Sequence, residues 1–303
     1  MTTEADATAA GARRRRPRFD LTTPTLLGLP VGWLVVFFLV PIGIVGAYSV
    51  GALYLSVFPG DVPITLDAWR DLFGGSQDLR LFWKSVKMSL IVSTVVVLLA
   101  YPLAYYLALS GTKRKYVLLL ILIAPFLTSY LLRVLAWKVI LGSQGVVNSF
   151  LYWTGFRDSD DPVSQLLYSR FAVILVLVYV WVPFVALPIF VSLEGLDRRL
   201  LEAASDLGAS RWQAFARVTL PLSVPGVVAA FLFVFIPTVG EFVTPSLVGG
   251  TSGYMYGSEI NDLFQASLDW QTGSVLALFL LGVVTLLTLV FSRFLRVDRV
   301  AAG

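Results

Sequence analysis

Residues 171–221 read FAVILVLVYVWVPFVALPIFVSLEGLDRRLLEAASDLGASRWQAFARVTLP. Residues 171–193 carry no charged side chain, and a helix needs about 20 apolar residues to cross the hydrocarbon core of a bilayer. A polar run with charges of both signs follows, and Leu222 then opens another apolar segment. The stretch therefore predicts two membrane-spanning helices joined by a structured polar loop.

The rest of the chain repeats this pattern. Hydrophobic residues make up 57% of the 303 positions and the mean hydropathy is +0.81, whereas soluble domains are about 45–50% apolar. Only helices and closed barrels satisfy the backbone in lipid, and continuous apolar runs are unlike the alternating pattern of a barrel strand. We predict an all-α membrane protein with six transmembrane helices, near residues 25–50, 88–110, 116–141, 171–193, 222–248 and 272–294.

The distribution of basic residues predicts the orientation. Alternate loops hold 15 Lys and Arg on one side of the expected membrane and six on the other. Because cytoplasmic loops keep the excess of positive charge, we expect both termini and the loop 198–221 to be cytoplasmic. Residues 1–24, which include RRRRPRF at 13–19, are expected to be a disordered basic tail before the first span, rather than a signal peptide or a nucleic-acid-binding patch.

Missing residue types argue against an enzyme. The chain has no Cys and no His, so it lacks a thiolate site, the usual metal ligand and the usual proton shuttle. It also lacks the G-x-x-x-x-G-K-[ST] loop that cradles nucleotide phosphates. We expect no catalytic residues, no metal and no cofactor in this chain.

The polar run reads locally as two short helices. Apolar side chains at helical spacing predict the first helix, and Gly208 is expected to end it in the left-handed conformation. Ser210 and Gln213 have the spacing of a capping box that opens the second helix, which Pro221 is expected to close. Such an element either docks on another protein or lies on the membrane surface as an amphipathic loop.

The spacing within this run resembles a known signature. Glu-Ala-Ala, three residues, Gly, nine residues, an aliphatic residue, one residue and Leu-Pro is the cytoplasmic motif of ABC importer permeases. The matching positions are Glu202, Ala203, Ala204, Gly208, Val218, Leu220 and Pro221. Val218 stands where the family usually has isoleucine. The resemblance implies the type I importer permease fold over residues 84–296, with the loop 198–221 docking on an ATPase subunit.

Four further segments narrow the resemblance to one branch. They are YPLAYYLAL at 101–109, PFLTSYLLRVLAW at 125–137, LGSQGVVNSFL at 141–151 and IPTVGEFVTPSLVGG at 236–250. They are similar to the first permease subunit of spermidine/putrescine transporters. The resemblance implies a bacterial inner-membrane protein that works with a second, unlike permease, a homodimer of ATPase subunits that bind Mg-ATP, and an extracytoplasmic polyamine-binding protein. An importer for thiamine, a phosphonate or another organic cation remains the alternative.

The chemistry of a polyamine suggests where its path lies. A chain of ammonium groups needs carboxylates or carbonyl dipoles along an aromatic wall. The expected outer loop 249–271 holds Glu259, Asp262 and Asp269 and no Lys or Arg. This loop contacts the substrate, receives the binding protein, or is simply solvated.

Prolines interrupt the fifth apolar segment, and interrupted membrane helices often line a substrate path. The alternative is a proline kink that neighbouring helices repair. Glu241, beyond Pro237 and Gly240, is expected in the outer half of the span, where it either binds the substrate or pairs with Arg133. The residues predicted to line the path are Tyr130, Trp137, Glu241 and Asp262.

The sequence argues against two other classes of function. A secondary transporter or channel would not need the docking loop, and internal repeats typical of such proteins are not evident. A membrane scaffold would not need a broken span that carries a carboxylate.

Overall fold

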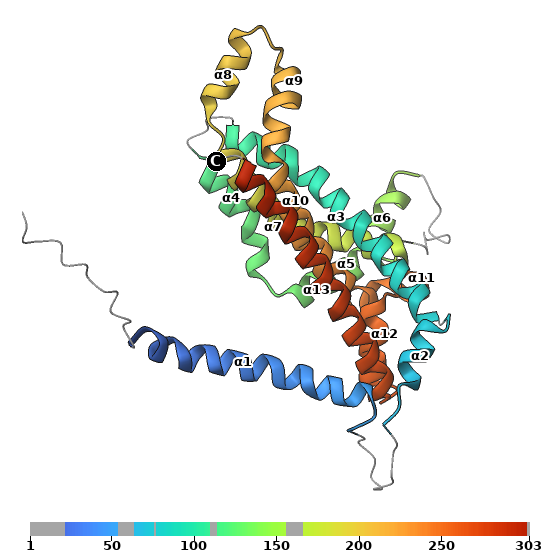
Figure 1. Ribbon diagram of the computed structural model, residues 1–303. Coiled ribbons are helices and arrows are strands. Elements are labelled where there is room, and N and C mark those ends of the chain that lie inside the picture. The colour runs from blue at the N-terminus through green and yellow to red at the C-terminus, as the bar shows by residue number, and fades with distance from the viewer. Residues whose placement is uncertain (1–21, 54–63, 76, 110–113, 156–165, 302–303) are drawn as a thin grey trace, which may run out of the picture.

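The computed structural model describes residues 22–53, 64–75, 77–109, 114–155 and 166–301 (Figure 1). The described residues contain helices and no strand. The helices longer than one turn are α1 (Thr22–Ser49), α2 (Asp67–Phe73), α3 (Gln77–Leu109), α4 (Lys115–Ile123), α5 (Tyr130–Leu141), α6 (Val146–Trp153), α7 (Arg170–Glu194), α8 (Arg198–Asp206), α10 (Leu220–Val239), α12 (Tyr256–Gln265) and α13 (Trp270–Ala301). Six helical segments in the described residues are long and apolar enough to cross a membrane.

The core of the bundle is formed by α3, α7 and α10. Small side chains let these helices approach closely, among them Ala100 and Ala104 of α3 and Ala186 of α7, all fully buried. Gly226 of α10 lies against α7 so tightly that a Cβ atom there would be 2.3 Å from the Cβ of Ser192. Small residues at helix contacts are the usual means of packing in a membrane, where lipid offers no hydrophobic drive for association.

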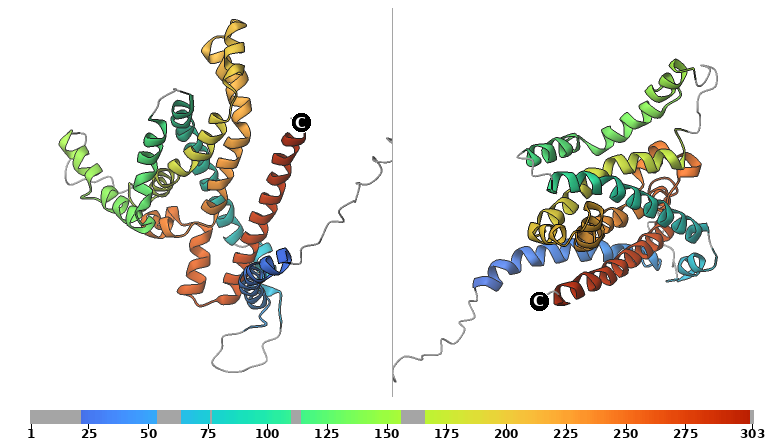
Figure 2. Two further views of the ribbon diagram at one scale, coloured as in Figure 1. Left: turned by 90° about the vertical axis from the view of Figure 1, so that its left-hand side faces the viewer. Right: turned by 90° about the horizontal axis from the view of Figure 1, so that it is seen from above.

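The first span lies at the edge of the bundle. The end of α1 contacts the start of α13, where the rings of Tyr48 and Trp270 are 5.4 Å apart, and the two helices diverge from there (Figure 1 and the left-hand view of Figure 2). None of the apolar stretch of α1 is buried, and Phe37 and Phe38 expose 61% and 66% of their surface. A helix that is apolar all round suits a lipid or protein environment in the membrane. The helix begins at Thr22, so residues 22–24 are not part of the tail expected from the sequence; residues 1–21 lie outside the described residues.

The prediction of a single helix over 116–141 is wrong. α4 ends at Ile123, a 3₁₀ turn follows over Ala124–Leu127, and Thr128 is extended before α5 begins at Tyr130. Pro125 removes one helical N–H donor, and the Thr128 hydroxyl donates to the Pro125 carbonyl at 2.6 Å. The continuous apolar composition concealed this break, and the spanning segment of this region is Tyr130–Trp153, made of α5 and α6.

The fifth span also differs from the prediction of 222–248 at both ends. Pro221 does not close the polar element, because α9 (Arg211–Ala214), the π-helical turn η2 (Phe215–Thr219) and α10 follow one another without a break. The wider π turn accommodates the missing N–H of Pro221. At the other end α10 stops at Val239, and a second π-helical turn, η3 (Pro245–Gly249), follows the break.

Candidate functional site

The polar element formed by α8 and α9 projects beyond the end of the bundle (Figure 1). Gly208 between the two helices has φ +80°, which confirms the left-handed turn expected there. The capping box is confirmed as well: Gln213 N–H donates to the Ser210 hydroxyl at 3.3 Å, and Ser210 N–H donates to Gln213 Oε1 at 2.9 Å. Asp197 caps α8 by accepting from Arg199 N–H at 3.0 Å. Local hydrogen bonds therefore fix the element's shape without help from the bundle.

Two large apolar side chains of this polar element are uncovered. Leu207 exposes 89% of its surface and Trp212 exposes 73%. Ala203 is exposed beside them, and Glu202 forms no ion pair with the described residues, although Arg198 and Arg199 precede it on the same helix. We call Glu202, Ala203, Leu207 and Trp212 the α8–α9 surface.

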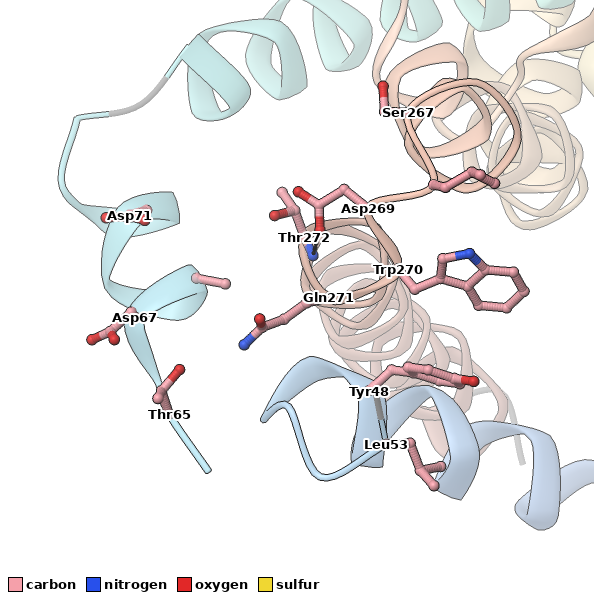
Figure 3. A pocket seen from close by; sticks show the side chains of 12 residues that line it. Tyr48, Leu53, Thr65, Asp67, Asp71, Ser267, Asp269, Trp270, Gln271 and Thr272 are labelled. Atoms are coloured by element: carbon pink, nitrogen blue, oxygen red, sulfur yellow. Dashed lines mark hydrogen bonds between the residues drawn. The ribbon is translucent and has the colours of Figure 1, made fainter. Parts of the chain in front are cut away.

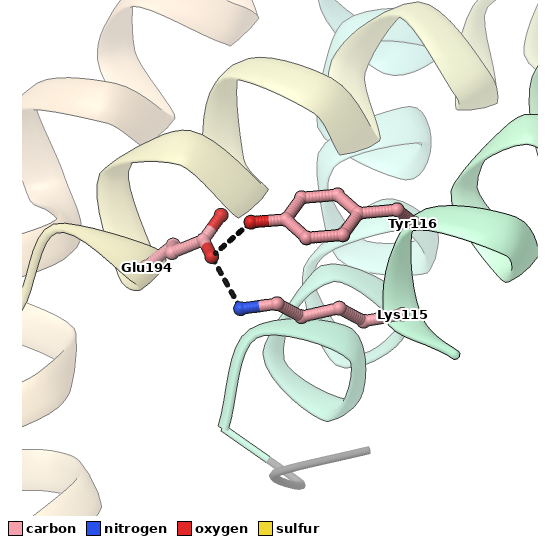
Figure 4. Close-up of polar contacts among 3 residues, drawn as sticks. All are labelled: Lys115, Tyr116 and Glu194. Atoms are coloured by element: carbon pink, nitrogen blue, oxygen red, sulfur yellow. Dashed lines mark hydrogen bonds and ion pairs between the residues drawn. The ribbon is translucent and has the colours of Figure 1, made fainter. Parts of the chain in front are cut away.

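An ion pair lies at the base of this element. Lys115 Nζ, at the start of α4, contacts Glu194 Oε1 at the end of α7, and the Tyr116 hydroxyl donates to the same oxygen at 3.0 Å (Figure 4). The hydrogen bond to Glu194 raises the pKa of Lys115 above the usual value for lysine. Because α8 begins four residues after Glu194, the pair connects the root of the α8–α9 element to α4.

Glu241 lies in the break that follows α10. Its Oε1 accepts from Val243 N–H at 2.9 Å and from Thr244 N–H at 3.1 Å, so the side chain caps the next helical turn. The Tyr130 hydroxyl of α5 donates to the same oxygen at 3.0 Å and contacts the Thr244 hydroxyl at 2.5 Å. All of these bonds to Glu241 use Oε1, which leaves Oε2 without a hydrogen-bond partner among the described residues. Glu241 is partly exposed, so Oε2 can receive a cation.

Arg133 does not pair with Glu241 in this conformation. The ion pairs among the described residues are Arg70–Asp67 and Lys115–Glu194. The Arg133 guanidinium instead lies over the ring of Phe126, 4.4 Å from the ring centroid, and its Nε and Nη1 atoms are buried without a hydrogen-bond partner in the described chain.

The four residues predicted to line the path fall into three places. Tyr130 and Glu241 are brought together by the hydrogen bond described above. Trp137 packs edge-to-face on Tyr179 at 5.4 Å. Asp262 on α12 accepts from the Tyr254 hydroxyl at 2.7 Å.

Partial burial and the hydrogen bond to Asp262 favour the protonated form of Tyr254. Partial burial raises the pKa of Tyr254 above the usual value for tyrosine, and the hydrogen bond to Asp262 raises it further. The Tyr254 hydroxyl therefore stays protonated into alkaline solution and donates its hydrogen bond to Asp262 there.

The end of the bundle opposite α8 holds a pocket that sequence reasoning missed. Figure 3 shows Asp67 and Asp71 of α2 across an open space from Asp269 and Trp270 at the start of α13, and the cavity has a volume of about 720 Å³. Asp269 accepts from Thr272 N–H at 3.0 Å and so caps α13. The acidic loop 249–271 pointed to Asp269, but nothing in the sequence showed that α2 would lie opposite.

A second cavity at this end, of about 420 Å³, is mixed in charge. Asp78 and Glu259 line it together with Arg80 and Lys84. The absence of Lys and Arg from the loop 249–271 therefore does not make this surface uniformly acidic, because α3 contributes basic residues to it.

Comparison with known proteins places this fold in a family. Residues 100–301 match the model of the "Binding-protein-dependent transport system inner membrane component" family. The chain belongs to this family, and it is a permease subunit of an ABC importer with several membrane spans.

Two relatives resemble the chain over most of its length. It is 36% identical to the "Spermidine/putrescine transport system permease protein PotB" of Haemophilus influenzae, covering 86% of this chain and 90% of the relative. It is 35% identical to the protein of the same name from Escherichia coli K12, covering 87% and 94%.

A solved structure shares the fold. The permease chain in the crystal structure of a bacterial ABC transporter involved in the import of the acidic polysaccharide alginate superposes with a TM-score of 0.65, at 21% identity, covering 91% of this chain and 97% of that chain.

Proposed function

We propose that this permease forms, with a second and unlike permease, the pathway for uptake of spermidine and putrescine. The observation that carries the proposal is the similarity to spermidine/putrescine permeases, at 35–36% identity over almost the full length of both chains. The geometry supports it, because Glu241 offers a free carboxylate oxygen at a helix break. A carboxylate inside a membrane span is a strong partner for an ammonium group.

Energy for transport comes from a separate homodimer of ATPase subunits. The α8–α9 surface supplies the docking site: Leu207 and Trp212 enter a groove of the ATPase, and Ala203 lets its backbone approach closely. In this arrangement Mg-ATP binds to the partner, and this chain holds no cofactor. The α8 end of the bundle and both termini are cytoplasmic, in keeping with the distribution of Lys and Arg.

The opposite end receives solute from an extracytoplasmic binding protein. The mixed charges of Asp78, Arg80, Lys84 and Glu259 give that surface the polar character of a transient interface. The aspartates of the pocket in Figure 3 add negative potential, which raises the local concentration of a polycation near the entrance.

The test is uptake of radiolabelled spermidine into proteoliposomes that contain the complete transporter, with its binding protein and ATP. Saturable, ATP-dependent uptake that excess putrescine suppresses is the expected result. If thiamine, a phosphonate or an unrelated organic cation suppresses spermidine uptake and putrescine does not, that compound and not a polyamine is the substrate. Uptake that persists without ATP and follows an ion gradient would assign the chain to the secondary transporters.

A further inference from the structure

Six aromatic side chains form a continuous strip that joins four parts of the bundle. Each ring touches the next, with neighbouring centroids 5.3 to 6.2 Å apart. The rings come from the α4–α5 connection, α5, α7 and α10. In order along the strip they are Trp137, Tyr179, Phe126, Phe184, Trp181 and Phe233. We call these six residues the aromatic strip.

The aromatic strip is open along one side. Phe233, Phe184 and Tyr179 expose 54%, 41% and 38% of their surfaces, and none of the six rings is fully buried. The face of an aromatic ring carries negative potential and attracts cations within about 6 Å of its centroid. A half-open row of rings thus offers consecutive positions to a cation, with apolar surface between them for methylene groups.

One of these positions already holds a cation. The Arg133 guanidinium lies 4.4 Å from the centroid of Phe126, the third ring of the strip. Its Nε and Nη1 atoms have no hydrogen-bond partner in the described chain, and no described carboxylate lies within 4.0 Å of it. The face of the Phe126 ring is therefore the contact in the described chain that stabilises the positive charge of Arg133. Because charged side chains in membrane spans face the bundle interior or a water-filled cavity, Arg133 indicates that the strip faces one of these environments at Phe126 and not lipid.

The strip is linked to the Glu241 carboxylate through α5. Arg133 follows Tyr130 by one helical turn, and the Tyr130 hydroxyl donates to Glu241 Oε1 at 3.0 Å. The residue that anchors Glu241 and the cation that covers Phe126 therefore lie on neighbouring turns of the same helix.

We propose that Arg133 is a resident cation that competes with the ammonium groups of the substrate for the aromatic strip and so sets how tightly the pathway holds them. This inference rests on the proposed function. A row of rings beside a carboxylate would trap a polycation, and conduction requires binding that is weak enough for release. Arg133 weakens the binding of the substrate in two ways: it occupies the face of Phe126, and it repels the ammonium groups of the substrate at Glu241. The substrate passes by displacing the guanidinium, which returns once the ammonium group has moved on.

Equilibrium binding of labelled spermidine to the complete transporter in nanodiscs, together with uptake rates in proteoliposomes, tests this role. Arg133→Gln should bind spermidine about threefold to fivefold more tightly, the worth of one cation–π contact, and should transport it with a lower maximal rate. Phe126→Leu in the Arg133→Gln background should reverse the gain in affinity. Lys138→Gln is the matched control, because Lys138 lies on the same helix but against Tyr168, at 5.9 Å and off the strip. It should change neither quantity.

Three outcomes would overturn the inference or its basis. Unchanged or weaker spermidine binding by Arg133→Gln would overturn it directly. Arg133 has a structural role instead if Arg133→Gln lowers the melting temperature and leaves the affinity for spermidine unchanged, and if Arg133→Lys restores the melting temperature. If the native complex transports spermidine and Glu241→Gln weakens that transport, the proposed function stands even when the Arg133 variants contradict this inference. A native complex that neither binds nor transports spermidine overturns both.

Discussion

The hydroxyl of Tyr130 on α5 donates a 3.0 Å hydrogen bond to Oε1 of Glu241, 111 residues later in the chain. The same oxygen caps the turn that follows the break at Gly240. The carboxylate is thus fixed from two sides through one oxygen, while the other oxygen stays free. Oε1 therefore shapes the backbone, while Oε2 can still accept a further hydrogen bond.

Glu241→Gln should therefore separate the two roles. The amide oxygen of glutamine can still accept from Val243 N–H and Thr244 N–H, so assembly and melting temperature should change little. Loss of the charge should lower spermidine uptake by about tenfold, because a hydrogen bond to a charged group contributes about 1.5–3 kcal/mol. Uptake assays and thermal melting of the same preparation give both numbers. Normal uptake by Glu241→Gln would show that the carboxylate does not contact the substrate.

Tyr130→Phe is the complementary change. It removes the donor to Glu241 and the contact with Thr244 but keeps the ring, so Oε1 retains its two backbone donors. We expect a smaller loss of uptake than with Glu241→Gln, and a melting temperature lower by the equivalent of about 1 kcal/mol for a lost hydrogen bond. An uptake loss equal to that of Glu241→Gln would instead mean that the tyrosine hydroxyl itself binds the solute.

Docking of the ATPase on the α8–α9 surface predicts a selective effect at Leu207. Because this side chain is 89% exposed, Leu207→Asp should leave the fold intact and abolish co-purification of the ATPase subunit. Ile64→Asp is the control, since Ile64 is 73% exposed and precedes α2, at the end of the bundle opposite α8. Pull-down from mild detergent with quantification of both subunits is the measurement. Retention of the ATPase by Leu207→Asp would place the docking site elsewhere.

The ion pair between Lys115 and Glu194 predicts a particular pH dependence. The pKa of Lys115 is raised in the folded protein, so its contribution to stability is complete below the ordinary lysine pKa and is lost as the pH rises through the raised value. Between pH 7 and 9 the melting-temperature difference between the native chain and Lys115→Met should therefore be constant. It should shrink only in strongly alkaline buffer. A difference that disappears near pH 8 would contradict the contact in Figure 4.

Much of the docking element could be predicted because its signals are local. The left-handed Gly208 and the capping box of Ser210 and Gln213 depend on residues at most three positions apart. The break at Thr128 escaped prediction, because apolar residues surround Pro125 on both sides and hydropathy does not register a change in backbone geometry. The contact of Arg133 with Phe126 escaped prediction as well, since the two residues lie seven positions apart across a helix break and their approach depends on how α5 returns to the bundle.

The pairing of Tyr130 with Glu241 could be predicted only in part. Chemistry singled out both residues, a carboxylate in a broken span and an aromatic hydroxyl at a similar depth. The sequence offered Arg133 as the protein partner of Glu241, with the substrate as the alternative, and did not show that Tyr130 would take this place. The choice depends on helix rotation: Tyr130 and Arg133 are one turn apart on α5, and only the hydroxyl reaches Glu241 Oε1.

The turn at Gly208 offers the sharpest test of coupling. A Cβ atom at this position would meet no other atom within 4 Å, so a substitution is opposed only by the left-handed backbone, with φ +80°. Gly208→Val should cost about 1–2 kcal/mol or change the angle between α8 and α9. Asparagine tolerates left-handed conformations, so Gly208→Asn is the matched control that changes size without forbidding the turn.

We expect Gly208→Val to assemble at normal protein level but to lose most ATP-dependent uptake, and Gly208→Asn to retain most of it. Uptake, bound ATPase and stimulated ATP hydrolysis measured on the same proteoliposomes distinguish loss of docking from loss of coupling. Full uptake by Gly208→Val would show that the shape of the α8–α9 element does not transmit the energy of ATP hydrolysis to the pathway.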